Sequence, residues 1–164
     1  MRSRRLARVP ALAGALTMMA CITVLTGCAA QEENDMSPQD ARDGLTAVVH
    51  DTAALLDGLQ WKVLSGPSVE ACSVDGADGA RYVYAYAAEP GADHAAAGQT
   101  VADYWKSLGL TVRTVTDPAV SVYADGGPVS SLSFHTEPGL YGITGTSVCV
   151  PGDADQLRDE SPTG

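Results

Sequence analysis

The second half of the chain is divided by turn-forming residues at short intervals, and this spacing constrains the fold more than any other feature of the sequence. The turns are Asp117-Pro118, Asp125-Gly126-Gly127 and Glu137-Pro138-Gly139. They separate runs rich in apolar and β-branched residues, which cover 110–115, 120–124, 129–136 and 140–150. Strand-length runs joined by turns this short pair with their sequence neighbours in opposite directions, so the sequence predicts an antiparallel meander.

Two helices are expected to accompany these strands. The segment Ser37-Pro38-Gln39-Asp40 carries a capping serine, a proline suited to the first helical position and an acidic residue where a capping box places one. Apolar residues then recur at helical spacing as far as Leu59. A second helix is expected from His94 to Leu108, because its apolar residues form one stripe and Gly109 suits the position after a helix end.

The segments between the two helices complete the expected fold. Residues 61–64 are expected to form a short strand, 66–79 a turn-rich loop, and 81–87 a second strand. The resulting order of elements predicts an α+β domain over 37–150 with two layers, a mainly antiparallel sheet and two helices packed on one of its faces. The polar residues 151–164 are expected to form a flexible acidic tail.

The N-terminal residues have the three parts of an export signal. Arginines occupy positions 2, 4, 5 and 8, an apolar run follows from Val9 to about Leu25, and small residues come next. A membrane-spanning helix needs about 20 apolar residues, whereas this run is shorter and contains Pro10 and Gly14. The pattern therefore predicts a signal peptide.

The apolar run ends in Leu25-Thr26-Gly27-Cys28, which resembles the lipobox of bacterial lipoproteins. The resemblance implies that the thiol of Cys28 receives a diacylglycerol and that cleavage between Gly27 and Cys28 removes 1–27. Acyl chains such as palmitate would then hold the protein on the extracytoplasmic face of the cell membrane, with 28–36 as a lipidated tether. Two alternatives stay open: the ordinary signal of a secreted protein with a chance cysteine, and an uncleaved anchor helix.

Two cysteines remain for the folded domain once Cys21 and Cys28 are assigned to the leader and the lipid site. In an extracytoplasmic domain, Cys72 and Cys149 favour a disulfide, and closing so long a loop stabilises a fold by about 4 kcal/mol. A metal site or a redox pair is the alternative, although no CxxC spacing supports either. In size, in this expected disulfide and in Cys28, the chain is similar in style to small uncharacterised lipoproteins of GC-rich Gram-positive, actinobacterial species.

Charge is distributed unevenly along this acidic chain. The whole sequence has a formal net charge of −10, with 20 acidic and 10 basic residues. Four of the bases precede the apolar run, so the remainder carries six bases against all 20 acids, a net charge of −14. Such a surface repels nucleic acid and would attract cations or a basic partner. The alternative is that the acids only keep an exported domain soluble.

Motifs that would indicate an enzyme or a metal site are missing from the sequence. It contains no GxSxG, HExxH, P-loop or GxGxxG pattern. His50, His94 and His135 fall on three different expected elements. The two acids of Asp75-Gly76-Ala77-Asp78-Gly79 are too few for a calcium loop and are explained by turn formation. We therefore expect no metal, no cofactor and no catalysis.

Tyrosines alternate along the second expected strand and lie on one of its sides. Tyr82, Tyr84 and Tyr86 would form an aromatic row that, if exposed, could stack on a sugar or accept a peptide. They are therefore the candidate ligand-binding residues. The alternative places them in the core beneath the helices, where Trp61 and Trp105 are also expected.

These observations favour a lipid-anchored envelope protein that binds without catalysing. Its membrane contact would be the lipid on Cys28, and its partner would be an envelope protein or a wall polymer. A carrier of a small apolar or lipid ligand is one alternative, which a cavity between sheet and helices would support. A cell-surface hydrolase is the other, but it needs two carboxylates that face a cleft, and the spacing of Asp93 and Asp103 does not pair them.

Overall fold

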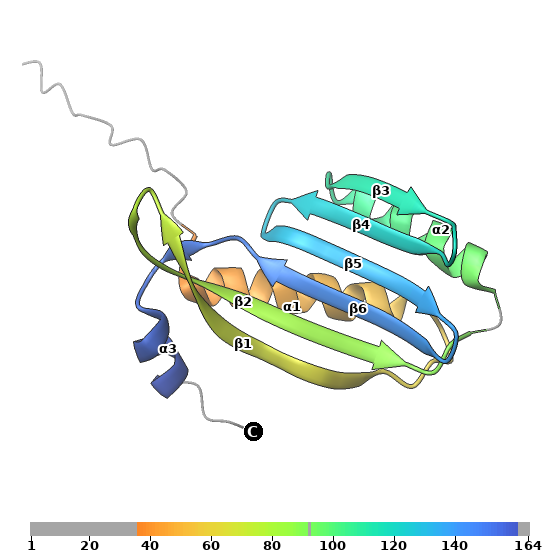
Figure 1. Ribbon diagram of the computed structural model, residues 1–164, viewed down its shortest axis with the longest axis horizontal. Coiled ribbons are helices and arrows are strands. Elements are labelled where there is room, and N and C mark those ends of the chain that lie inside the picture. Colours follow the sequence, from red (N-terminus) through yellow and green to blue (C-terminus); the bar gives the residue numbers. More distant parts are fainter. Residues whose placement is uncertain (1–35, 92, 161–164) are drawn as a thin grey trace, which may run out of the picture. The chain divides into compact units, whose positions relative to one another are not determined.

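The computed structural model describes residues 36–91 and 93–160, and within them it has three helices and seven strands (Figure 1). The helices are α1 (Pro38–Ala54), α2 (His94–Ser107) and α3 (Ala154–Glu160). The strands are β1 (Lys62–Val74), β2 (Ala77–Ala88), β3 (Thr111–Val115), β4 (Ser121–Gly126), β5 (Val129–Glu137), β6 (Leu140–Ser147) and β7 (Val150–Pro151). The α+β class predicted from the sequence is confirmed.

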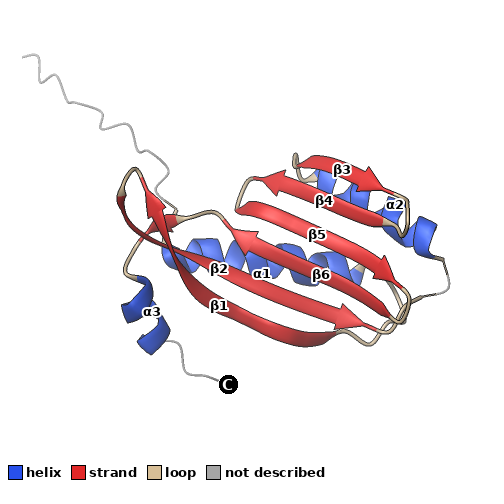
Figure 2. Ribbon diagram, in the orientation of Figure 1, coloured by secondary structure: helices blue, strands red, loops and turns tan. Residues whose placement is uncertain are grey.

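All seven strands belong to one antiparallel sheet. Its order is β1-β2-β6-β5-β4-β3, and the short β7 pairs with β2. The chain makes a β1–β2 hairpin, crosses through α2 to the far edge, and returns as the predicted meander from β3 to β6 (Figure 2). Pairing of β2 with β6 joins the hairpin to the meander. Without this central pair the strands would not form one continuous sheet.

Helices α1 and α2 pack side by side against the same face of the sheet (Figure 1). The capping box at α1 is present, since Ser37 Oγ accepts from the backbone N–H of Asp40 at 3.1 Å and the Asp40 carboxylate accepts from the N–H of Ser37. Helix α1 lies so close to β6 that a Cβ on Gly145 would be 2.6 Å from a methyl of Leu45. The opposite face of the sheet carries small polar side chains such as Ser131 and Thr144, which are exposed.

Strand β1 is much longer than the short strand expected over 61–64. It continues to Val74, so most of the expected loop over 66–79 is strand. Gly66-Pro67 looks like a turn in the sequence, but here the pair lies within an irregular stretch of register between Ser65 and Ser68. Proline is tolerated at this place because β1 is an edge strand, on which one row of backbone N–H groups has no strand partner.

Part of the expected flexible tail is helix α3, which corrects that prediction. Asp153 caps the helix, since its carboxylate accepts from the backbone N–H groups of Asp155 and Gln156 at 2.9 and 3.1 Å. Ala154 is buried, and Arg158 donates to the backbone oxygen of Val69 at 3.2 Å. The tail therefore packs along the edge strand β1.

The predicted disulfide between Cys72 and Cys149 is present, with the two Cα atoms 6.1 Å apart. Cys72 lies within β1 rather than in a loop, and Cys149 lies between β6 and β7. The bond ties the edge hairpin to the end of the meander. Among the described helices, none is both long and apolar enough to cross a bilayer.

Candidate functional site

The tyrosine row faces the helices and is mostly core, which corrects its assignment as a ligand-binding surface. Tyr82 and Tyr84 are buried, with exposed fractions of 4% and 3%. Tyr86 differs from them, since it is half-buried and lies at the rim of the core. Two of the three candidate residues are therefore covered, and one faces an opening.

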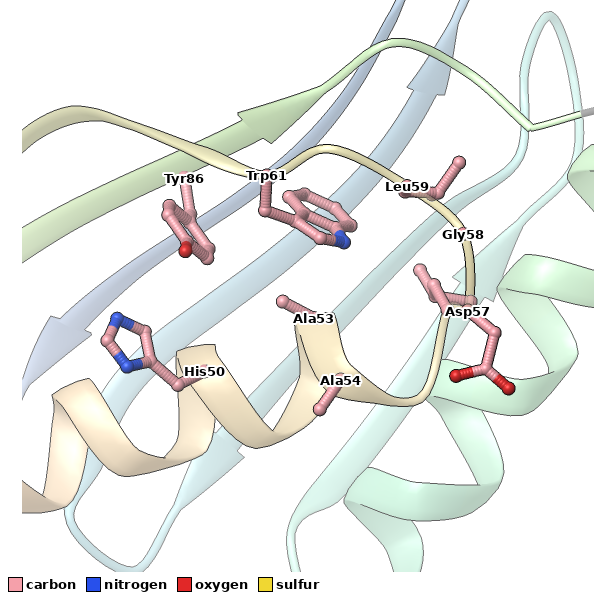
Figure 3. Close-up of a pocket in the computed structure, with 9 residues that line it drawn as sticks. His50, Ala53, Ala54, Asp57, Gly58, Leu59, Trp61 and Tyr86 are labelled. Atoms are coloured by element: carbon pink, nitrogen blue, oxygen red, sulfur yellow. The ribbon is translucent and has the colours of Figure 1, made fainter.

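That opening is a surface pocket of about 380 Å³ where α1 ends beside the first residues of β1. We call it the aromatic pocket; its lining includes His50, Ala53, Leu56, Leu59, Trp61 and Tyr86. Figure 3 shows three sources for these side chains: His50 and Ala53 on α1, Tyr86 on β2, and Leu59 and Trp61 on the segment that leads into β1. A pocket of this volume is within the range that binds small molecules.

Three rings line the aromatic pocket, those of His50, Trp61 and Tyr86, and the buried ring of Tyr84 lies behind them. Trp61 stacks on Tyr86, with centroids 5.6 Å apart and planes inclined by 22°. Tyr86 also stacks on Tyr84 at 5.9 Å and lies 5.2 Å from the ring of His50. Such offset arrangements are favourable for aromatic rings, so the wall is held together before any ligand arrives.

The polar atoms of this cluster are unequally satisfied. His50 Nε2 and the hydroxyl of Tyr84 are 2.9 Å apart and hydrogen-bonded. Burial raises the pKa of Tyr84 above its ordinary value, and the neighbouring Tyr86 adds to this effect. The indole N–H of Trp61 is buried and has no hydrogen-bond partner, the one side-chain atom of its kind within 36–91 and 93–160. An unsatisfied buried donor costs about 1–3 kcal/mol, and such groups are few in native structures.

The electrostatic environment of the aromatic pocket is negative. The pocket lies at the C-terminal end of α1, where helix carbonyl groups give a partial negative charge, and no basic residue occupies the last turn of α1. Asp57, also in the lining, is exposed. Lys62 follows Trp61 in the chain, but it pairs with Ala87 whereas Val63 pairs with Tyr86, so its side chain lies on the opposite face of the sheet.

A second pocket of about 260 Å³ adjoins the first across the α1–β1 loop. It shares Leu56, Asp57 and Leu59 with the aromatic pocket, and the rest of its lining includes Ala96 and Thr100 of α2 and Tyr141 of β6. The α1–β1 loop therefore has an opening on each side. Only the aromatic pocket combines stacked rings with a buried donor that no described residue satisfies.

The remaining sequence candidates do not form a reactive centre in the described part of the chain. His94 contacts the backbone oxygen of Thr136, and His135 contacts Ser121, each 3.0 Å away, while His50 contacts Tyr84, so each histidine has a different polar partner. Asp93 caps α2 and Asp103 pairs with Lys106. Residues 36–91 and 93–160 hold no group of three or more His, Cys, Asp or Glu side chains that could bind a metal ion.

The predicted lipid site lies outside the described residues. Cys28, Gly27, the signal peptide over 1–27 and nearly all of the tether over 28–36 precede Met36, where the description begins. The chain enters the domain at the start of α1. Because α1 has 17 residues, the aromatic pocket at its other end lies about 25 Å away along the helix axis.

Comparisons with known proteins bear on the fold. No family model matches the chain, and no curated protein matches it. The structure is similar to the crystal structure of a DUF4853 family protein from Actinomyces odontolyticus, with a TM-score of 0.52 and 16% sequence identity over 71% of this chain and 67% of that chain. At this level of identity the similarity shows a common fold.

Proposed function

We propose that the chain is a lipid-anchored binding module of the cell envelope that holds its ligand in the aromatic pocket and does not catalyse a reaction. The observation that carries this proposal is the aromatic pocket itself, where stacked rings lie beside a buried indole N–H that has no partner among the described residues. The anchor through Cys28 rests on the resemblance of Leu25-Thr26-Gly27-Cys28 to a lipobox.

The distribution of exposed apolar side chains supports a binding role for this end of the domain. Three large apolar residues with exposed fractions of 41–62% lie where α1 ends and β1 begins; they are Leu55, Val63 and Leu64. Gathered apolar exposure is a usual property of binding surfaces. Among the described acids, Asp40 and Asp93 cap helices, while four others form ion pairs with basic neighbours; they are Asp43, Glu70, Asp103 and Asp155.

The anchor is tested by expressing the full chain in a Gram-positive host and measuring the mass of its mature N-terminal peptide. We expect a peptide that begins at Cys28 and carries a diacylglyceryl group. Cys28→Ser should move most of the protein from the membrane fraction into the medium or leave the leader uncleaved. Cys21→Ser is the matched control and should behave as the parent, because Cys21 precedes the expected cleavage site. An unmodified thiol on a mature membrane-bound protein would overturn the anchor.

A further inference from the structure

We infer that the aromatic pocket binds a small soluble organic cation whose charge is a methylated ammonium group. This inference deepens the proposed binding function and rests on it. The faces of aromatic rings attract cations, Trp most strongly. The pocket offers the ring of Trp61, backed by Tyr86 at a centroid distance of 5.6 Å, and the ring of His50 beside it.

The charges around the rings act in the same direction. The C-terminal end of α1 contributes partial negative charge with no basic residue in the last turn to offset it. Figure 3 shows the carboxylate of Asp57 pointing away from Trp61, so it acts on a bound cation through its field rather than by contact. Lys62, the nearest base in the sequence, is directed to the other face of the sheet.

The basic side chains of the domain give little competition for a cation. Arg42, Arg81, Lys106 and Arg158 each pair with an acidic neighbour. Arg113 lies over the ring of Tyr123, with its guanidinium carbon 4.4 Å from the ring centroid. With a net charge of −14 after the N-terminal arginines, the protein raises the local concentration of cations in general.

The methylated form follows from what the pocket lacks in its lining. A metal ion needs several oxygen, nitrogen or sulfur ligands, and no such group exists among the described residues. A primary ammonium group must lose strong hydrogen bonds to water, and the ring faces of the aromatic wall do not replace them, since the carboxylate of Asp57 points away from Trp61 (Figure 3). A trimethylammonium group is weakly hydrated, and aromatic cages are its usual binding sites.

The test is calorimetric titration of the purified full chain in a nonionic detergent with choline at pH 8, where imidazoles are generally neutral. The matched ligand is 3,3-dimethylbutan-1-ol, which has the shape of choline with carbon in place of the charged nitrogen. We expect saturable choline binding in the low millimolar range and binding of the neutral analogue that is at least fivefold weaker. Equal binding of the two would overturn the inference, because the pocket would then be merely apolar.

Variants locate the site. Trp61→Leu keeps an apolar side chain but removes the ring, so choline affinity should fall at least tenfold. Asp57→Asn should weaken choline binding about twofold and leave binding of the neutral analogue unchanged. Asp117→Asn, an equal charge change in the exposed turn before β4, is the control and should retain parental affinity. Loss of choline binding in this control would place the site elsewhere.

The inference and the proposed function fail in different ways. N-acetylglucosamine or glucose, titrated in place of choline, should give no heat, and saturable sugar binding lost in Trp61→Leu would replace the cation with a sugar while the binding module stands. If choline does not bind to a folded, lipidated chain, the inference of a cationic ligand is wrong and the lipid anchor is unaffected. Choline binding by a chain that carries no lipid on Cys28 would overturn the anchor alone.

Discussion

The two tryptophans of the domain occupy opposite kinds of environment. Trp105 on α2 is fully buried, and its indole N–H donates to Oγ1 of Thr52 on α1 at 2.8 Å. Trp61 is half-buried in the aromatic pocket, and its indole N–H is buried without a partner. The first joins two helices with every polar atom satisfied, while the second leaves an unsatisfied donor beside an open surface. The contrast separates a residue that maintains the fold from one that costs stability.

The largest difference in stability between the two sites is expected when each tryptophan is replaced by alanine. Trp105→Ala should lower the free energy of unfolding by about 3–5 kcal/mol, because it opens a cavity in the core. Trp61→Ala should lower it by about 1 kcal/mol, since part of the ring is already in water and the unsatisfied N–H is removed with it. Urea unfolding followed by circular dichroism measures both. Equal losses would show that Trp61 supports the fold as Trp105 does.

A smaller loss of stability is expected if the indole N–H of Trp105, like that of Trp61, is left without a hydrogen-bond partner. Thr52→Val preserves shape but removes the hydroxyl that accepts from Trp105 and donates to the backbone oxygen of Val48 at 2.6 Å. The buried indole N–H would lose its partner, and stability should fall by about 1–2 kcal/mol. Thr46→Val is the matched control, because the hydroxyl of Thr46 also donates to a helix oxygen, at 2.8 Å, but accepts from no tryptophan. If Thr52→Val lowers the free energy of unfolding no more than Thr46→Val does, the hydrogen bond to Trp105 does not distinguish the two tryptophans.

The smallest effect is expected from Trp61→Phe. The substitution retains an aromatic ring and removes the unsatisfied donor, so lost packing and relieved desolvation should nearly cancel. We expect an unfolding free energy within about 0.5 kcal/mol of the parent. Trp105→Phe, which loses a satisfied bond and leaves Thr52 without its donor, should cost about 2 kcal/mol. A Trp61→Phe loss as large as this would show that the indole N–H is satisfied in solution.

The two tryptophans also differ in how well the sequence predicts them. Trp105 continues a stripe with Ala97 and Val101 along one helix, and helical periodicity shows directly which residues of a helix are buried. Trp61 was expected in the core by the same chemical reasoning, but it lies in a short extended segment where no period exists to tell which side is covered. Its half-buried position depends on how α1 ends, which is set by tertiary packing.

Local signals predicted the two long helices and the meander, and they failed for the extent of β1 and for α3. The caps at Ser37 and Gly109 placed the helices, and the Gly and Pro turns placed the meander, because both depend on a few adjacent residues. Gly66-Pro67 led the sequence to predict a turn where β1 in fact continues. An edge strand tolerates a proline at such a position, whereas a central strand does not. Asp153 was a usable cap signal for α3, but its helix is too short and polar for a periodic pattern.

The aromatic pocket was beyond prediction from the sequence. Its wall combines His50, Trp61 and Tyr86, which come from three segments with no common spacing. Tyr86 was a candidate only as part of a row whose other members, Tyr82 and Tyr84, are buried. What separates Tyr86 from them is the end of α1 at Ala54, beyond which the helix no longer covers β2.

The pairing of β2 with β6 has a consequence for how the chain folds. Val83 is aligned with Thr146 across this pair, so a strand made early must wait for one of the last segments to be synthesised. Until then β2 presents tyrosines and unpaired backbone groups, a template for association between chains. A chain shortened before Leu140 would keep that template permanently, and its fate would be aggregation or proteolysis.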